Sequence, residues 1–288
     1  MRRPAPQTLD DIRHPGPQAQ DRLPHAFCHA TKIEFRVLAG EPLLEALGRR
    51  ADDAGFSSAV LNLSGVNLAA FDYVMPDRAI DDRHAAWYSD THSSKGTQLE
   101  EAVAILGWRD GTWFAHVHAY WQENDAWHLG HLLPETLTIS DDANISGHGL
   151  VGARFEASLD LETEFTLFRV KSDRNAMSGK TANALITTLA PFTDLHEGIA
   201  KLGNQLPGSG YSVLGLGSLA GAQFEDGPPM TGLISEILLQ NGAGSPKNGK
   251  LSLPLRTVDL NKDLFQGRAK PGKCPTLVTN ELLLVSKD

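Results

Sequence analysis

The sequence predicts a mixed α/β fold of the α+β type, in which one small domain occurs as two diverged copies. Two observations carry this prediction: a strand, a helix and a glycine-marked strand follow one another twice along the chain, and short turns join consecutive strands in each copy. Strands joined by short turns pair antiparallel. We therefore expect each copy to be a mostly antiparallel sheet with one main packed helix. The expected boundaries are 1–28 for a proline-rich arm, 29–175 for the first domain and 176–288 for the second.

The first domain is expected to begin after an extended arm, because residues 1–28 contain five prolines and proline fixes φ and lacks an amide donor. Polar and apolar residues alternate over 32–37, which predicts a strand with one buried face. Pro42 suits the first turn of a helix, and apolar residues follow it at helical spacing up to Ala54. Gly55 stands where a glycine that ends a helix belongs.

The remaining strands of the first domain are predicted from apolar runs between turn signals. Asp110-Gly111 and Glu123-Asn124-Asp125 mark two hairpin turns, and the polar segment 75–95 is expected to be a loop. The predicted strands cover 59–65, 68–73, 99–108, 112–121, 127–132 and, as a closing strand, 162–170.

The second domain repeats this order in a shorter form, which we interpret as an internal duplication with loop deletions. Residues 184–189 are strand-like, and apolar residues over 195–202 have helical spacing. The segments that align between the two copies are 59–65 with 212–218, Phe71 with Phe224, and 163–167 with 280–284.

Composition narrows the classes of function. The chain has 288 residues and a formal net charge of −9 at pH 7, and its Lys and Arg residues do not cluster. Proteins that neutralise DNA phosphates usually have a basic face, so DNA binding is less expected, though not excluded. No apolar run approaches the roughly 20 residues of a membrane span, and no signal peptide is recognisable, so we expect a cytoplasmic protein without a membrane partner. Cys28 and Cys274 lack metal-ligand spacing and are expected to be reduced.

The most informative motif is His116-Val117-His118, followed after a predicted turn by Gly130-His131. On a strand, residues i and i+2 point to the same face, roughly 6.5–7 Å apart at Cα. His116 and His118 should therefore converge, and the turn would bring His131 back to them. Three neutral imidazoles form a zinc-type ligand set that leaves a position for water or substrate. We predict a divalent metal site on these three histidines with zinc as the first choice, although other first-row metals also accept imidazole.

Several other groups are weaker candidates for the same site. The pattern does not fix the face of His128, His148 is expected in a loop, and His92 lies in the polar loop from which it could reach the metal. A metal-dependent reaction would also need a general acid or base. The candidates for that role, which the sequence does not rank, are Glu101, Asp125 and Glu135.

The second domain lacks the histidines. Thr257-Val258-Asp259 aligns with His116-Val117-His118, and Arg268 aligns with His131. We therefore expect the first domain to hold the chemistry and the second to serve as scaffold.

These residues carry a resemblance to the PPC domain (plants and prokaryotes conserved), a domain of unknown function. The first copy resembles it through 35–47, Leu63-Ser64-Gly65, His116-x-His118 with Gly130-His131, and Glu164-Phe165. The second copy resembles it through Asp194-Leu195, Leu216-Gly217-Ser218-Leu219 and Glu281-Leu282. The two copies together span nearly all of the chain after residue 28.

The resemblance implies an α/β domain that assembles as a homotrimer. Plant members accompany AT-hook segments, so the family is often labelled DNA-binding. A DNA-binding or transcription-associated protein with a three-histidine metal site is therefore our first hypothesis, although this chain has no Arg-Gly-Arg-Pro AT-hook. The alternatives are a metal-dependent, zinc-type enzyme acting on a small molecule, and a metal that only stabilises the hairpin or a subunit contact.

A cupin metal motif also fits part of the spacing, through His116-x-His118, Glu123 and Gly130. A cupin should then offer Pro-x-Gly followed by a fourth histidine. His148 is the only late histidine before the second copy, and no Pro-x-Gly precedes it.

Overall fold

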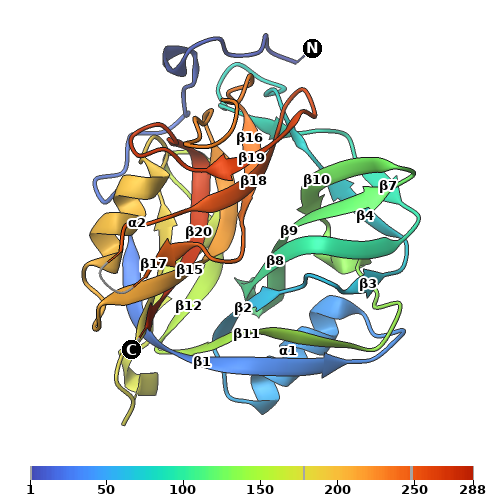
Figure 1. The fold of residues 1–288 in the computed structure, drawn as a ribbon, viewed down its shortest axis with the longest axis vertical. Coiled ribbons are helices and arrows are strands. Elements are labelled where there is room, and N and C mark those ends of the chain that lie inside the picture. Colours follow the sequence, from blue (N-terminus) through green and yellow to red (C-terminus); the bar gives the residue numbers. More distant parts are fainter. Residues whose placement is uncertain (1, 178, 247–248, 288) are drawn as a thin grey trace.

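Two antiparallel sheets pack face to face, and one α-helix covers the outer side of each (Figure 1). The computed structural model describes residues 2–177, 179–246 and 249–287. Within this part of the chain the fold is mostly antiparallel sheet with two α-helices, which confirms the predicted α+β class. β1 (His25–Val37) joins the sheets, because its first residues pair with β14 (Ala184–Leu189) and its later ones with β11 (Ala143–Val151).

The first sheet is built from β1 and from strands between residues 58 and 151. α1 (Leu43–Asp53) packs on it and buries Leu43, Leu47 and Ala51 at helical spacing, while Gly55 ends the helix with φ +72. The antiparallel order is β1, β11, β2 (Ser58–Asn62), β8 (Thr97–Arg109), β9 (Thr112–Glu123), β10 (Ala126–Leu132), β4 (Phe71–Val74) and β7 (His92–Ser94).

The second sheet is covered by α2 (Leu195–Gly203), whose first turn is capped by the side chain of Asp194 accepting a hydrogen bond from the Glu197 amide. Its antiparallel order is β14, β20 (Thr276–Lys287), β15 (Gly210–Leu219), β16 (Ser235–Leu239), β18 (Pro254–Asp259) and β19 (Leu264–Arg268). The remaining described elements are η1 (Leu9–Asp11), β3 (Asn67–Leu68), β5 (Pro76–Asp77), β6 (Trp87–Tyr88), η2 (Pro134–Thr136), β12 (Ala153–Leu159), β13 (Thr166–Ser172), η3 (Arg174–Met177) and β17 (Gly244–Ser245).

The two sheets share one pairing order. The series β1, β11, β2, β8, β9, β10 corresponds to β14, β20, β15, β16, β18, β19, and a helix follows the first strand of each series. This agreement supports the duplication, which stays a prediction together with its domain boundaries. It shows that the predicted alignment of 163–167 with 280–284 is wrong, because β20 takes the place of β11 while β13 forms a hairpin with β12. An apolar strand can pair with many other strands, so its own residue pattern does not identify its neighbours in the sheet.

β11 was not predicted from the sequence, because Ser146-Gly147-His148-Gly149 resembles a turn. His148 is therefore a strand residue, paired with Lys32 and Val60, rather than a loop residue. Both glycines permit close packing: a Cβ atom at Gly147 would lie 2.3 Å from the Val60 carbonyl oxygen, and one at Gly149 would lie 2.5 Å from the Phe56 ring.

The N-terminal arm lies on the body of the protein and is shorter than predicted, since β1 begins at His25 inside the stretch assigned to the arm. Ile12 is buried, the Gly16 amide donates to the Glu162 carbonyl, and Arg22 forms an ion pair with the Glu162 carboxylate. These contacts hold the arm against a segment that lies far from it in the sequence.

Apolar side chains from both sheets fill the layer between them. Those from the first sheet include Val60 and Ile105, β12 adds Phe155, and those from the second sheet include Ile186, Leu216 and Leu283. All of these side chains are fully buried. The interface between the two sheets is therefore closed to solvent, like the core beneath each helix.

Replacing Ile186 with valine removes one methylene from this layer. We expect the free energy of unfolding to fall by about 0.5–1.5 kcal/mol, since Ile186 is fully buried and the cavity left behind cannot fill with water. Urea denaturation measures the change, with the exposed Ile80→Val as the control. Equal losses in the two variants would contradict a packed interface.

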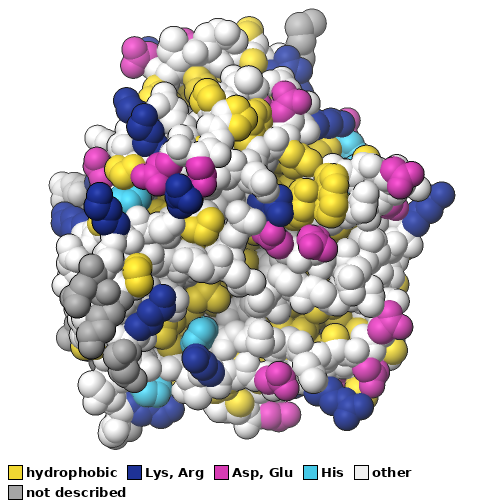
Figure 2. All heavy atoms as spheres, viewed as in Figure 1, with side chains coloured by type: hydrophobic (Ala, Val, Ile, Leu, Met, Phe, Trp, Pro, Cys, Tyr) yellow, Lys and Arg dark blue, Asp and Glu magenta, His cyan; other side chains and the backbone are white. Residues whose placement is uncertain are grey.

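The surface carries both signs of charge. Figure 2 shows acidic and basic side chains interspersed on the face drawn, without a continuous field of Lys and Arg. Across the described residues, no helix has the length and apolar character needed to cross a bilayer.

Candidate metal centre

β9 and β10 place the three predicted histidines on one face of the first sheet. Val117 points into the core beneath α1, so His116 and His118 on either side of it point toward the second sheet. Asn124 and Asp125, with φ of 51° and 61°, make the tight turn into β10. His131 then lies directly opposite His118 in the register of the two strands.

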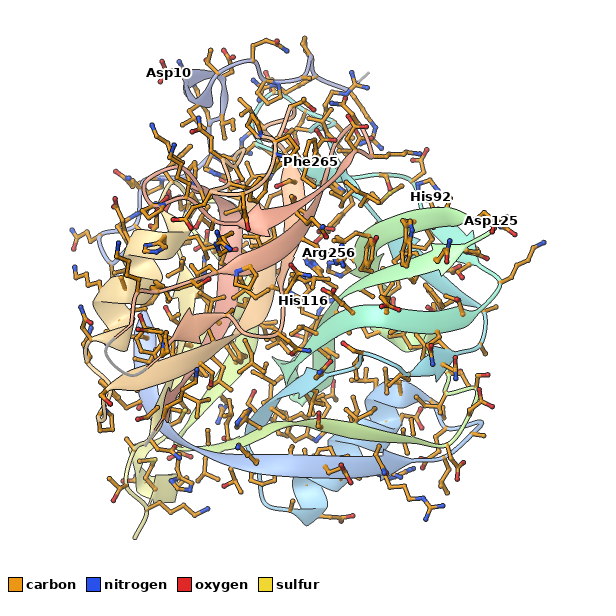
Figure 3. The ribbon with its side chains drawn as sticks, viewed as in Figure 1. Asp10, His92, His116, Asp125, Arg256 and Phe265 are labelled. Carbon is orange, nitrogen blue, oxygen red and sulfur yellow. The ribbon has the colours of Figure 1, made fainter. Side chains whose placement is uncertain are left out.

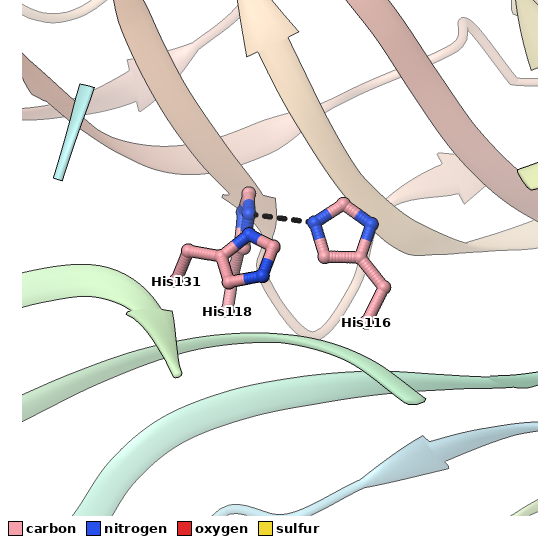
Figure 4. A group of neighbouring side chains, drawn as sticks. All are labelled: His116, His118 and His131. Atoms are coloured by element: carbon pink, nitrogen blue, oxygen red, sulfur yellow. Dashed lines mark hydrogen bonds between the residues drawn. The ribbon is translucent and has the colours of Figure 1, made fainter. Parts of the chain in front are cut away.

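The three imidazole rings meet closely (Figure 4). Each ring offers one nitrogen, and these nitrogens lie within 4.8 Å of one another. The Nε2 atoms of His116 and His118 are 3.0 Å apart. This is the convergence that the strand period and the hairpin predicted.

Two groups of the second sheet orient these rings. Nδ1 of His116 lies 2.8 Å from Oε2 of Glu281 on β20, and Nδ1 of His118 lies 2.8 Å from the Ile237 carbonyl oxygen on β16. Both oxygens accept, so each Nδ1 carries the proton and donates it outward. The Nε2 atom of each ring is then left with a lone pair toward the centre of the cluster.

The donor set therefore fits a metal ion. Two lone pairs at 3.0 Å repel one another unless a proton or a cation lies between them. Outward Nδ1–H bonds to a carboxylate and a carbonyl are the usual outer contacts of histidine metal ligands. The third ring follows the same logic, because Nδ1 of His131 lies 3.0 Å from the Tyr88 hydroxyl, and donation to that hydroxyl leaves Nε2 for the metal.

Glu236 on β16 brings a carboxylate to the same point. Its Oε1 atom is 3.6 Å from Nε2 of His118 and 3.8 Å from Nδ1 of His131, and its side chain is 6% exposed. Among the described residues, its Oε2 atom has no hydrogen-bond partner.

Burial sets the protonation of the cluster. It lowers the pKa of His118 and of His131 well below 6.5, and neighbouring imidazoles lower both further. Burial raises the pKa of Glu236 to about 8, against a smaller opposite effect of the Tyr88 hydroxyl. His118 and His131 are therefore neutral at pH 7, which is the form that binds a metal.

The three histidines, Glu236 and Glu281 line a cavity of about 370 Å³. Most of its other walls are apolar, with aromatic side chains supplied by Trp87, Phe114, Phe165 and Phe168. Figure 3 shows His116 between the strands of the two sheets, while Asp125 and His92 lie at the far end of the β9–β10 hairpin. The site is thus enclosed by both halves of the chain.

The weaker sequence candidates do not line this cavity. Among the histidines, His92 stacks on Tyr73, His128 stacks on Trp121, and His148 lies on β11. Among the acids, Glu101 binds Arg256 and Gln240, Asp125 is in the turn, and Glu135 is exposed in η2. Glu123, which a cupin would need as a ligand, accepts from the Lys95 amide instead.

Glu236 and Glu281 are the site residues that sequence reasoning missed, and both lie in the half expected to be scaffold. Each interrupts an apolar strand, in Ile234-Ser235-Glu236-Ile237 and in Glu281-Leu282-Leu283. A charged residue in such a run is seldom buried without a partner, and this signal could have found both.

Replacing Glu281 with glutamine keeps the shape of the side chain and removes its charge. Because Glu281 orients His116 through Nδ1, we expect metal affinity to fall about 10–100-fold. Titration with zinc against a competing chelator measures the change. An unchanged affinity would show that the bond does not hold the ring in place.

No protein-family model matches the chain, and no curated protein matches it. A PPC (plant- and prokaryote-conserved) protein from Pyrococcus horikoshii is 18% identical in its solved structure, with a TM-score of 0.37, over 49% of this chain and 94% of that one. The chain resembles PPC proteins over about half of its length.

Two other solved structures match to a similar extent. A metal-containing protein from Archaeoglobus fulgidus is 15% identical with a TM-score of 0.37, over 48% of this chain and 93% of that one. A protein from Ralstonia eutropha JMP134, named as a candidate for DNA binding, is 16% identical with a TM-score of 0.38, over 48% of this chain and 90% of that one. Each match covers about half of this chain and at least nine-tenths of the other protein.

Proposed function

We propose that this protein is a divalent-metal-dependent enzyme that acts on a small, largely apolar molecule, with His116, His118 and His131 as metal ligands. The observation that supports it is the convergence of three imidazoles in the wall of an apolar cavity large enough for a small substrate. Zinc is the first ion to test, because three imidazoles suit it and leave a position open.

The cavity can bind a substrate and keep bulk water away from it. Its aromatic walls favour a substrate with an apolar body, and burial of the site by both sheets keeps bulk water from the reacting group. Arg109 is the one Lys or Arg among the described residues that line the cavity, and its half-exposed side chain favours a substrate with a negative end toward solvent. A divalent ion held here supplies Lewis-acid chemistry, which polarises a substrate oxygen or activates water for hydrolysis.

A hydrolysis assay tests the proposal. Metal-stripped protein and protein reloaded with zinc, manganese, cobalt or nickel are compared on small aryl esters, amides and phosphates, with and without a carboxylate on the ring. We expect turnover only with metal and only in protein that retains His116 and His118. Equal activity in metal-stripped protein, reloaded protein and protein without His116 and His118 would exclude a metal-dependent enzyme.

The DNA-binding role and the trimer that the resemblance implies stay predictions. Because the net charge is −9 and the face in Figure 2 has no basic field, we expect no retardation of duplex DNA in a gel at low salt, where phosphate contacts are strongest. A shift that weakens steeply as salt is added would favour the DNA-binding hypothesis instead. Light scattering of the same sample gives the mass of the assembly.

A further inference from the structure

Glu236 faces the three histidines from the opposite sheet. It stands on β16 next to Ile237, whose carbonyl oxygen holds His118, so the strand that orients one imidazole also delivers the carboxylate. The Oε1 atom of Glu236 lies 3.6 Å from His118 Nε2 and 3.8 Å from His131 Nδ1. The first is a separation at which two atoms can bind the same ion, and the second shows that the carboxylate lies against the His131 ring, whose Nδ1 atom faces the Tyr88 hydroxyl.

The surroundings of Glu236 satisfy its carboxylate only in part, through the Tyr88 hydroxyl. The side chain is more than nine-tenths buried, and the Oε2 atom has no hydrogen-bond partner in the part of the chain that is described. Burying a carboxylate in this way is costly unless a cation or a donor compensates it. Arg109 is the only lysine or arginine among the described residues that line the cavity, and it forms no ion pair with Glu236.

Glu281 provides the contrast within the same cavity. Its carboxylate accepts the Nδ1 proton of His116 at 2.8 Å, on the side of the ring turned away from the cluster. Glu236 instead lies on the side where the Nε2 atoms of His116 and His118 meet. The two acids therefore have different roles: one orients a ligand, and the other reaches the ion itself.

We propose that Glu236 is a fourth metal ligand, so that the second half of the chain completes a site begun by the first. This inference rests on the proposed function. An ion bound in this way would link the two sheets, through three nitrogen ligands from the first sheet and one oxygen ligand from the second. Since the cavity needs an open position for substrate, the proposal favours ions that take five or six ligands over a strictly tetrahedral one.

Cobalt binding tests this assignment, because the visible spectrum of Co²⁺ reports the number and type of its ligands. We compare wild type with three isosteric variants of the full chain: Glu236→Gln, Glu281→Gln and Glu101→Gln. Glu101 is the matched control, since it also joins the two sheets, through Arg256, but does not line the cavity. Thermal unfolding of each metal-free protein checks that it is folded.

We expect Glu236→Gln to weaken cobalt binding by at least about 100-fold, beyond the usual range for outer contacts, and to change the spectrum. Glu281→Gln should weaken binding less and keep the shape of the spectrum, and Glu101→Gln should change neither. Glu236→Asp, which retains a carboxylate, should keep the wild-type spectrum and recover part of the affinity; if Glu236→Gln does not fold, this variant carries the test.

An unchanged spectrum in Glu236→Gln overturns the assignment, whether or not affinity falls, because the ion would then have kept all of its ligands. Failure of the proposed function looks different. In that case wild type itself takes up no cobalt, or takes it up equally well without His116 and His118.

Discussion

Replacing His116 and His118 together with alanine is expected to take the metal content of the purified protein from a single ion per chain to background. The two Nε2 atoms are 3.0 Å apart and both rings are already oriented by hydrogen bonds, so the pair supplies two of the three histidine ligands. We expect affinity to fall by at least about 1,000-fold, since changes to outer contacts alone cost 10–100-fold. Elemental analysis after dialysis against zinc measures the content.

The matched control is the double variant His92→Ala and His128→Ala. These histidines come from the same sheet but stack on Tyr73 and Trp121, outside the cavity. Metal content should be that of wild type. If the His116 and His118 variant retains metal, or if both double variants lose it equally, the three-histidine centre is not where this protein binds an ion.

The half of the site that lies on β9 and β10 could be predicted because it depends only on local geometry. Alternate residues of a strand share a face, and a two-residue turn returns the next strand alongside, so His116, His118 and His131 had to meet if 112–132 formed a hairpin. The same local logic predicted α1, α2 and the Asp110-Gly111 hairpin, whose two residues both have positive φ.

The other half could be found only as two buried acids and not placed at the histidines, because its position depends on how two sheets pack. Glu236 and Glu281 reach the histidines only because the dry layer of apolar side chains between the sheets sets their relative position. No strand pattern encodes that packing. The expectation that the second copy is only scaffold was therefore wrong: it lacks counterparts of the three histidines, but its Glu281 orients His116 and its Glu236 lies 3.6 Å from His118.

The stability of the metal-free protein should depend on pH in a way that Glu236 controls. The pKa of Glu236 is about 8 in the folded protein, against 4.5 when it is exposed. The folded state thus binds this proton more tightly than the unfolded state. Its contribution to stability is fully present below pH 4.5 and is lost as pH rises toward and through 8, on the order of a few kcal/mol in all.

The histidines act in the opposite direction. The pKa values of His118 and His131 are lowered from 6.5 by burial, so the stability that their neutral forms contribute is present above pH 6.5 and is lost as pH falls below it. The metal-free protein should therefore be most stable near neutral pH and should lose stability on both sides, with separate causes.

Thermal unfolding between pH 6.5 and 9 isolates the contribution of Glu236 from that of the histidines. We expect the melting temperature of metal-free wild type to fall with rising pH, and that of metal-free Glu236→Gln to change much less, because glutamine has no proton to lose. Saturating zinc or cobalt should abolish the alkaline fall in wild type, since a cation compensates the carboxylate charge. Equal slopes in metal-free wild type and Glu236→Gln would mean that the carboxylate is not held in the dry environment on which its role at the metal depends.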